Sequence, residues 1–297
     1  WKEGTDCCEW EGITCDPLTH HVIGLDLNHS RIKGTIESNS SLFLLRHLGY
    51  LDLSYNALHG PLPMKILNLP HLKYLDFGWN DGLFSDSPLS NWSSSLEVLD
   101  LSWVNLSTSL PSSPGRQHLK QLVLANCSIH GSIPTWVWNI SEGIDLIDNN
   151  INGNINLNIL SKLPELEWLS LSRSGLSVII PDERVNLTST WPQALSMLGL
   201  SNCNIQGKFP TWIHKIWKDS LWYLDLSHNS LTGTLSNFSG KLVVIDISNN
   251  ILEGPLPIPS IAALGFLASN NKFTGPIPTS ICNLTYLSIL DLSNNRL

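Results

Sequence analysis

Charged side chains are scarce in this chain. Only 14% of its 297 residues are charged, and 17 Lys and Arg stand against 25 Asp and Glu, which gives a net charge of −8. A protein that binds nucleic acid needs clustered cations to contact the phosphates. We therefore expect no nucleic-acid partner.

Long apolar runs and compact catalytic motifs are missing as well. No stretch approaches the roughly 18 apolar residues of a membrane-spanning helix, and no signal peptide is visible. The sequence contains no H-E-x-x-H, no G-x-S-x-G and no phosphate-cradling glycine loop. These absences predict a non-enzymatic chain without a cofactor or a metal site, and without a membrane span in this piece.

What the sequence does contain is one recurring phrase. Residues 221–231 read L-W-Y-L-D-L-S-H-N-S-L, and the shared template is L-x-x-L-x-L-x-x-N-x-L, numbered here as positions 1 to 11. The mean spacing between copies is about 24 residues, which lies in the range of leucine-rich repeats. Twelve copies begin at Val22, Leu48, Leu72, Leu96, Leu119, Ser141, Leu166, Leu195, Leu221, Leu242, Ala263 and Leu287.

The template predicts a stack of short strands. Positions 4 and 6 are apolar in every copy and alternate with polar neighbours, which is typical of a half-buried strand. Parallel stacking buries these faces against one another. We predict an α/β-type leucine-rich-repeat solenoid. It would form a curved right-handed superhelix with a parallel β-sheet on the concave face, and loops and short helical turns on the convex side.

Position 9 is asparagine in seven copies. An amide carries both donors and acceptors, so it can satisfy the buried backbone groups where the chain leaves the strand. The seven are Asn56, Asn80, Asn149, Asn229, Asn250, Asn271 and Asn295. Cys127 and Cys203 occupy position 9 in two other copies. They are three repeats apart, roughly 14 Å, and a disulfide needs Cα atoms within about 7 Å. We therefore predict two buried thiols in place of asparagine.

Residues 1–21 precede the first repeat and hold three cysteines. We predict a polar cap stapled by a Cys8–Cys15 disulfide, hence an oxidising compartment. Cys7 would pair with a cysteine upstream of Trp1. The predicted domains are an incomplete cap at 1–21 and about twelve repeats at 22–297, the last one truncated. We expect a fragment of a longer protein.

Sequons for N-glycosylation are frequent, which is typical of a secreted glycoprotein. The predicted sites are Asn28, Asn39, Asn91, Asn105, Asn126, Asn139, Asn186, Asn237 and Asn283. Asn28 falls on the concave strand face and Asn126 beside the asparagine ladder, so these two positions leave less room for a glycan than the others.

Positions 3 and 8 project from the predicted sheet and carry large aromatic and cationic residues, the types that dominate binding energy. The candidate ligand-binding residues are Tyr50, Tyr55, Tyr74, Trp79, Trp103, Trp168, Arg173, Tyr223 and His228. The alternatives are packing of one ring on the next along the ladder, or contact with a glycan.

Position 5 is aspartate in eight copies, four of them consecutive: Asp26, Asp52, Asp76, Asp100, Asp145, Asp225, Asp246 and Asp291. In water the repulsion of such neighbours is only ~0.8 kcal/mol per pair, which is tolerable if they are solvated. These residues either form an acidic face for basic peptides or bond to neighbouring strands and hydroxyls such as Ser54.

The cap sequence D-C-C-x-W-x-G-I-x-C-D (residues 6–16) resembles the N-terminal cap of plant leucine-rich-repeat receptors. The steps G-S-I-P (131–134), G-K-F-P (207–210), G-P-L-P (254–257) and G-P-I-P (275–278) resemble the G-x-I-P step of the plant-specific subclass. The double cysteine and residues 269–284 are most similar to the receptor-like proteins of cell-surface disease resistance.

This resemblance implies an immune receptor ectodomain at the extracellular (apoplastic) face of the plasma membrane, anchored by a segment absent from this sequence. It implies a pathogen- or damage-derived peptide, protein or glycan ligand, and signalling through an adaptor receptor kinase and a co-receptor. Three alternatives remain: a soluble inhibitor similar to the polygalacturonase inhibitors, the ectodomain of a receptor kinase, and a truncated product without function.

Overall fold

The computed structural model describes residues 4–85, 87–89, 93–113, 118–181 and 191–297. It divides into two compact units. Unit 1 comprises residues 1–140 and 148–150, and unit 2 comprises residues 141–147 and 151–297. The division falls at the repeat that begins with Ser141, where a polar residue replaces the first leucine of the template.

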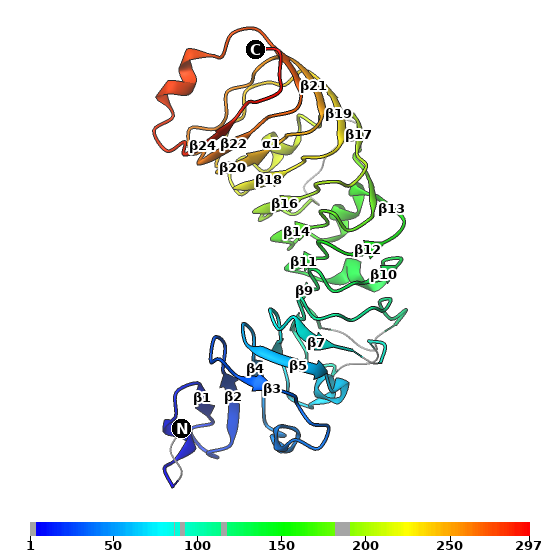
Figure 1. Ribbon diagram of the computed structural model, residues 1–297, viewed down its shortest axis with the longest axis vertical. Coiled ribbons are helices and arrows are strands. Elements are labelled where there is room, and N and C mark those ends of the chain that lie inside the picture. The colour runs from blue at the N-terminus through cyan, green and yellow to red at the C-terminus, as the bar shows by residue number, and fades with distance from the viewer. Residues whose placement is uncertain (1–3, 86, 90–92, 114–117, 182–190) are drawn as a thin grey trace. The chain divides into compact units, whose positions relative to one another are not determined.

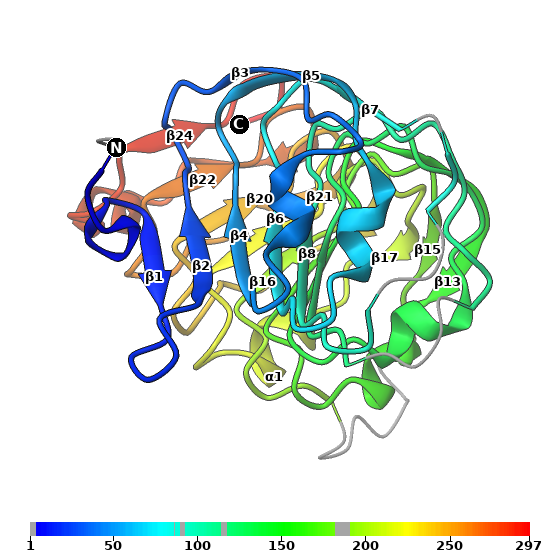
Figure 2. The same cartoon turned by 90° about the horizontal axis from the view of Figure 1, so that it is seen from below.

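Each repeat contributes a short strand around positions 3 to 5 (Figures 1 and 2). In unit 1 these are β2 (Val22–Asp26), β4 (Tyr50–Asp52), β6 (Tyr74–Asp76), β8 (Val98–Asp100) and β9 (Gln121–Val123), preceded by β1 of the cap (Ile13–Cys15). In unit 2 they are β11 (Gly143–Asp145), β14 (Trp168–Ser170), β16 (Met197–Gly199), β18 (Tyr223–Asp225), β20 (Val244–Asp246), β22 (Gly265–Leu267) and β24 (Ile289–Asp291).

The register of these strands places equal template positions side by side. β1 pairs antiparallel with β2, and the repeat strands pair in parallel, as in Tyr50 opposite Tyr74 and Tyr74 opposite Val98. Each unit is therefore a leucine-rich-repeat solenoid, as predicted, and every side chain at one template position belongs to a row that crosses the strands.

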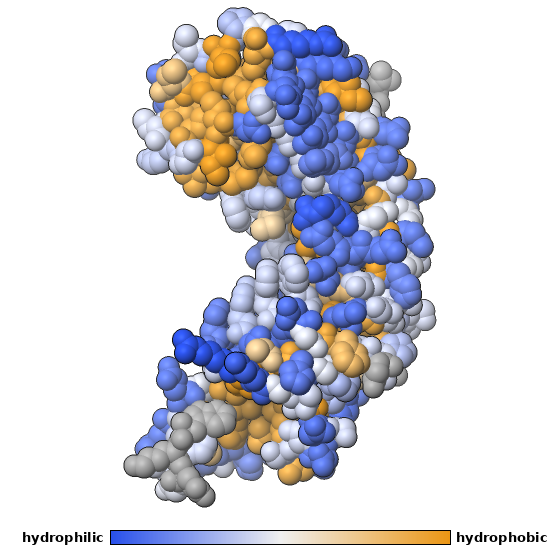
Figure 3. Space-filling model, viewed as in Figure 1, coloured by the Kyte–Doolittle hydropathy of each residue, from blue (hydrophilic) through white to orange (hydrophobic). Residues whose placement is uncertain are grey.

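The core is built from positions 4 and 6. Leu51, Leu75 and Leu99 have no exposed surface, and burying one such side chain contributes about 1.5–3 kcal/mol. Leu290, at position 4 of β24, is instead 43% exposed. Figure 3 shows apolar surface gathered at this end of unit 2.

The position-9 ladder forms as predicted. Asn80 donates from Nδ2 to the carbonyls of Leu53 (2.9 Å) and Phe77 (3.0 Å), and its Oδ1 accepts from the backbone N–H of Leu58 (3.0 Å). Cys127 and Cys203 are fully buried thiols, which confirms that prediction. The Sγ of Cys127 donates to the carbonyl of Leu101 (2.9 Å), so it supplies the donor half of the amide's role.

The returning segments hold short helical turns, as predicted: η2 (Ser41–Leu44), η3 (Met64–Asn68), η4 (Thr135–Asn139), η5 (Leu157–Lys162), η6 (Thr279–Asn283) and α1 (Ile213–Ile216), with η1 (Cys7–Glu9) in the cap. They also hold a second set of strands that we did not predict: β3 (Lys33–Gly34), β5 (Ala57–Pro61), β7 (Gly82–Phe84), β10 (His130–Gly131), β12 (Asn150–Ile151), β13 (Asn154–Asn156), β15 (Ser177–Ile179), β17 (Gln206–Lys208), β19 (Ser230–Gly233), β21 (Ile251–Pro255) and β23 (Lys272–Thr274).

The glycine of the G-x-I-P step explains where several of these strands turn. Gly131, Gly207 and Gly254 have φ between +80° and +94°, a region that residues with a Cβ rarely adopt.

Within the described residues, no helix has the length and apolar character needed to cross a bilayer.

Candidate functional site

Four aromatic side chains form a continuous row on the solvent-facing side of the unit 1 sheet. His29, Tyr55, Trp79 and Trp103, here called the aromatic row, occupy position 8 of the first four repeats. Successive rings stack with centroids 4.4, 5.3 and 4.9 Å apart and interplanar angles of 13°, 11° and 26°. Tyr55 and Trp79 are nevertheless 47% exposed and Trp103 39%.

Position 8 has an unusual backbone. All twelve residues at this position have positive φ, and those of Tyr55, Trp79 and Trp103 are 52°, 59° and 67°. Asn, Asp and His tolerate this left-handed region, whereas a bulky side chain there is an outlier. The strain costs about 1–2 kcal/mol per residue, so the aromatic row is placed where the backbone disfavours it.

His29 is the member of the row that sequence reasoning missed. It sits at the same template position as Tyr55 in the preceding repeat and stacks on its ring. The sequence does carry a signal for the backbone conformation at this position. Eight of the twelve copies have Asn, Asp or His at position 8, and these residue types favour positive φ.

A second ring pair lies along the same strands. Tyr50 and Tyr74, both at position 3, stack with centroids 4.4 Å apart. Their hydroxyls lie 3.4 Å from carboxylate oxygens of Asp52 and Asp76, respectively. Burial raises the pKa of both tyrosines, so they remain protonated donors.

The aspartates of position 5 serve the backbone. Asp52 Oδ1 accepts from the N–H (2.9 Å) and hydroxyl (2.6 Å) of Ser54, which matches the structural alternative considered above. Solvation differs along the acidic row, since Asp26 is exposed. Asp52 is 5% exposed, and burial raises the pKa of Asp100.

Asp76 makes stability depend on pH. Burial, followed by the charge of Asp100, raises its pKa from 3.8 to about 7. The folded state then holds this proton more tightly than the unfolded state, so the free energy of unfolding falls as pH rises through this interval. Asp76→Asn keeps an oxygen for the Gly78 N–H, now bonded at 2.7 Å. It should stabilise the chain by about 2 kcal/mol at pH 8, a figure discounted for partial solvation, and have little effect at pH 4.

Calorimetric melting temperatures at the two pH values test this. Asp291→Asn is the matched control, because Asp291 holds the same template position but its hydrogen bonds to Ser293 lower its pKa. The control should not be stabilised at pH 8. Equal shifts of the Asp76→Asn melting temperature at pH 4 and pH 8 would contradict the assignment.

The four remaining candidate residues lie in unit 2 and form no comparable row. Trp168 and Tyr223 both flank Met197 in the register of β14, β16 and β18. The Trp168 indole lies across Gly143, where an added Cβ would come within 1.9 Å of the ring. Arg173 and His228 have φ of 52° and 53° and are separated by the Asn202 repeat. Burial, followed by Asp225, raises the pKa of Tyr223 to about 12.

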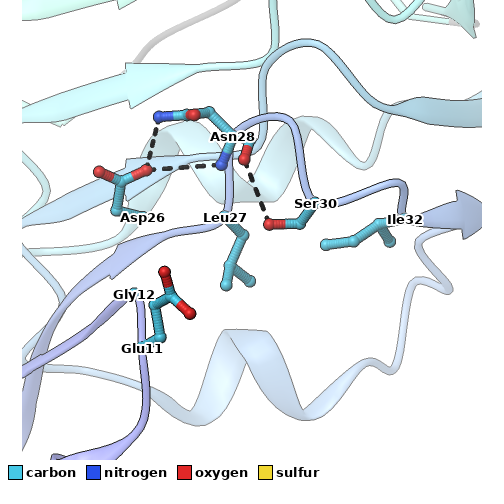
Figure 4. A pocket seen from close by; sticks show the side chains of 7 residues that line it. All are labelled: Glu11, Gly12, Asp26, Leu27, Asn28, Ser30 and Ile32. Carbon is cyan, nitrogen blue, oxygen red and sulfur yellow. Dashed lines mark hydrogen bonds between the residues drawn. The ribbon is translucent and has the colours of Figure 1, made fainter.

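Seven of the nine predicted glycosylation sites are described. Asn28, Asn39, Asn105, Asn139, Asn237 and Asn283 are exposed, and Asn126 is half-buried; Asn91 and Asn186 lie outside the described residues. Asn28 lines a pocket with Glu11 of the cap and Asp26, and its Nδ2 donates to Asp26 Oδ1 at 2.7 Å (Figure 4).

The cysteines of the cap provide too few ligands for a metal ion. Cys8 and Cys15 form a disulfide, whereas Cys7 does not. Asp6, Cys7 and Cys8 come close enough in the described chain to share an ion, but the sulfur of Cys8 is already bonded to Cys15. Two ligands remain, which is fewer than the three or four of a protein zinc site.

The comparisons with known proteins agree with this architecture. The model of the Leucine Rich Repeat family matches residues 118–140, 194–216, 220–242 and 266–284. The crystal structure of the Arabidopsis receptor kinase HAESA in complex with the peptide hormone IDA and the co-receptor SERK1 superimposes with a TM-score of 0.61, covering 99% of this chain and 61% of that one. At 23% identity, this likeness shows the fold alone.

Curated relatives supply the family. Receptor-like protein 50 of Arabidopsis thaliana is 50% identical over 105 residues, 35% of this chain and 12% of that protein. Receptor-like protein 6 of the same plant is 32% identical over 242 residues, 80% of this chain and 20% of that protein. The chain thus spans a fifth or less of the length of these two relatives. It belongs to the leucine-rich-repeat receptor-like proteins of plants.

Proposed function

We propose that this chain is the ligand-recognition part of a plant immune receptor-like protein at the extracellular face of the plasma membrane, and that the aromatic row is its principal contact. The observation that carries the proposal is the exposure of Tyr55, Trp79 and Trp103 at strained backbone positions. Strain of this kind persists at functional sites, where it is retained for a purpose other than stability.

The stacking defines what the row can offer. Because each ring covers the face of the next, a ligand meets mainly ring edges, which combine apolar surface with the indole N–H of the tryptophans. Carbonyl oxygens and aliphatic side chains of a peptide suit such a ridge. None of the ion pairs in the described residues involves the partly buried Asp76 and Asp100 alongside, and a basic side chain of the ligand beside them would favour their ionised forms.

The favoured ligand is therefore a peptide or a protein segment with a basic side chain near the row. It would come from a pathogen or from damaged tissue. HAESA binds a peptide hormone together with a co-receptor on the same fold, which supports a peptide ligand and a co-receptor for this protein too. Because receptor-like proteins are the relatives, we propose that signalling passes through an adaptor receptor kinase.

The test uses the intact receptor expressed in leaf tissue. Elicitor-active peptide fractions are scored for binding and for the response they trigger. Trp79→Ala with Trp103→Ala should weaken binding at least about tenfold, because aromatic anchors dominate interfaces. Trp222→Ala is the control, since Trp222 is 41% exposed but lies outside the row.

Unchanged affinity in the double variant, with the fold intact, would remove the row from the binding surface. Tight binding to a secreted pathogen polygalacturonase, with no response in the leaf, would favour the soluble-inhibitor alternative.

A further inference from the structure

Three histidines form a second row in unit 1, before the strands rather than after them. His21, His47 and His71 each immediately precede position 1 of the first three repeats, and all three are exposed. The rings of His21 and His47 are 4.1 Å apart, and those of His47 and His71 are 6.0 Å apart and nearly parallel. We propose that this histidine row binds a divalent transition-metal ion such as Zn²⁺ or Cu²⁺.

The sheet register builds the row. Gly24 pairs with Tyr50 and Tyr50 with Tyr74, so the residues three positions upstream are also aligned on chains about 4.8 Å apart. In the fourth repeat the same position is Ser95, whose hydroxyl donates to the carbonyls of Pro70 and Leu72. The row therefore consists of His21, His47 and His71.

The cap hairpin holds the first member in place. Asp16 Oδ1 accepts from the N–H groups of Leu18 (3.0 Å) and Thr19 (2.8 Å), and the N–H of Asp16 donates to the carbonyl of His21 at 2.9 Å. This turn fixes the backbone of His21 beside His47. The nearby Asp16 carboxylate adds negative charge that favours a cation.

The chemistry suits a borderline metal. Neutral imidazole is a preferred ligand of Zn²⁺ and Cu²⁺, with bonds of about 2.0–2.1 Å that put two nitrogens on a tetrahedral ion roughly 3.3 Å apart. Rings with centroids 4.1 Å apart reach this by rotation of exposed side chains. His71, whose ring is 6.0 Å from that of His47, adds a third nitrogen only after its exposed side chain rotates as well, and water completes the shell. Ca²⁺ and Mg²⁺ prefer oxygen and should not bind.

Calorimetric titration of the full chain with ZnCl₂ and CuSO₄, and with CaCl₂ as a negative control, tests the site. His47→Ala removes the central ring and should weaken Zn²⁺ binding by about tenfold or more, the scale of loss seen when groups around metal sites are removed. His130→Ala should leave binding unchanged, because His130 is exposed in the same unit but lies outside the row. Zn²⁺ should also raise the melting temperature of the wild type, since an ion that binds only the folded state stabilises it.

His47→Gln keeps a side chain of similar size and serves if the alanine variant folds poorly. In NMR spectra, Cu²⁺ should broaden the ring signals of His21, His47 and His71 before those of His130. Equal Zn²⁺ affinity in His47→Ala and wild type, equal weakening by His130→Ala, or no Zn²⁺ heat in the wild type would each overturn the proposal.

Discussion

Replacing Asn80 with alanine is expected to lower the free energy of unfolding of unit 1 by about 3–5 kcal/mol. The side chain is fully buried and links its own repeat to the preceding one by hydrogen bonds. Its amide donates to Leu53 and Phe77 and accepts from Leu58. Alanine removes the side-chain partner of the Phe77 carbonyl and of the Leu58 N–H, at a cost of about 1–3 kcal/mol each, whereas the Leu53 carbonyl still accepts from Asn56 Nδ2 (2.9 Å).

Asn80→Cys is the informative companion. Cys127 shows that a thiol at this position donates to the preceding repeat, so cysteine should recover the donor half of the role and about a third of the loss. Urea denaturation followed by circular dichroism gives both values. An alanine variant within 1 kcal/mol of wild type would show that the amide ladder contributes little.

Substitution of the aromatic row is expected to have the opposite effect, with stability nearly unchanged and ligand binding weakened. Substituting Tyr55, Trp79 and Trp103 with asparagine relieves strain of about 1–2 kcal/mol per residue and gives up stacking worth about 0.5–1.5 kcal/mol per pair. The two effects nearly cancel, so the free energy of unfolding should change by no more than about 1 kcal/mol. Ligand affinity, in contrast, should fall about 100-fold, as expected when several anchors are removed together.

Asparagine is the natural choice for this exchange. It already occupies position 8 in five other repeats, as in Asn249 and Asn270, where φ is 53° and 54°. The backbone of the variant therefore adopts a conformation that the chain uses elsewhere without strain.

The repeat pattern predicts the fold because each template position has one physical task. Leu51 and Leu75 must be apolar to fill the core, and Asn80 must carry an amide to satisfy the turn. These demands recur every repeat, so they are visible in the sequence. The replacement of asparagine by Cys127 and Cys203 followed from the same reasoning.

What the pattern did not reveal depends on contacts between particular side chains. Packing of one ring on the next was one of the alternatives drawn from the sequence, and Tyr55 does stack on Trp79, but the pattern could not choose this alternative because it depends on rotamers. The burial of Asp52 depends on how closely Tyr50 and the neighbouring strands approach. The position of Trp168 depends on a glycine, Gly143, in the preceding repeat.

The histidine row was missed for a different reason. His21, His47 and His71 lie just outside the template, where residues vary between repeats, and the spacing of such residues carries no core pattern. Only the register of the strands brings the three rings together. The second strands of the returning segments were missed similarly, since positions such as those of β17 include no alternating apolar face.

Peptide binding and unfolding, measured on the variant with asparagine at positions 55, 79 and 103, separate a ligand-binding role of the aromatic row from a structural role. If the aromatic row binds the ligand, the unfolding free energy of this variant stays close to that of wild type and its affinity falls about 100-fold. Wild-type affinity in this variant, or a loss of several kcal/mol of stability, would contradict this expectation. The first result would remove the aromatic row from the binding surface, and the second would mean that the row serves the fold.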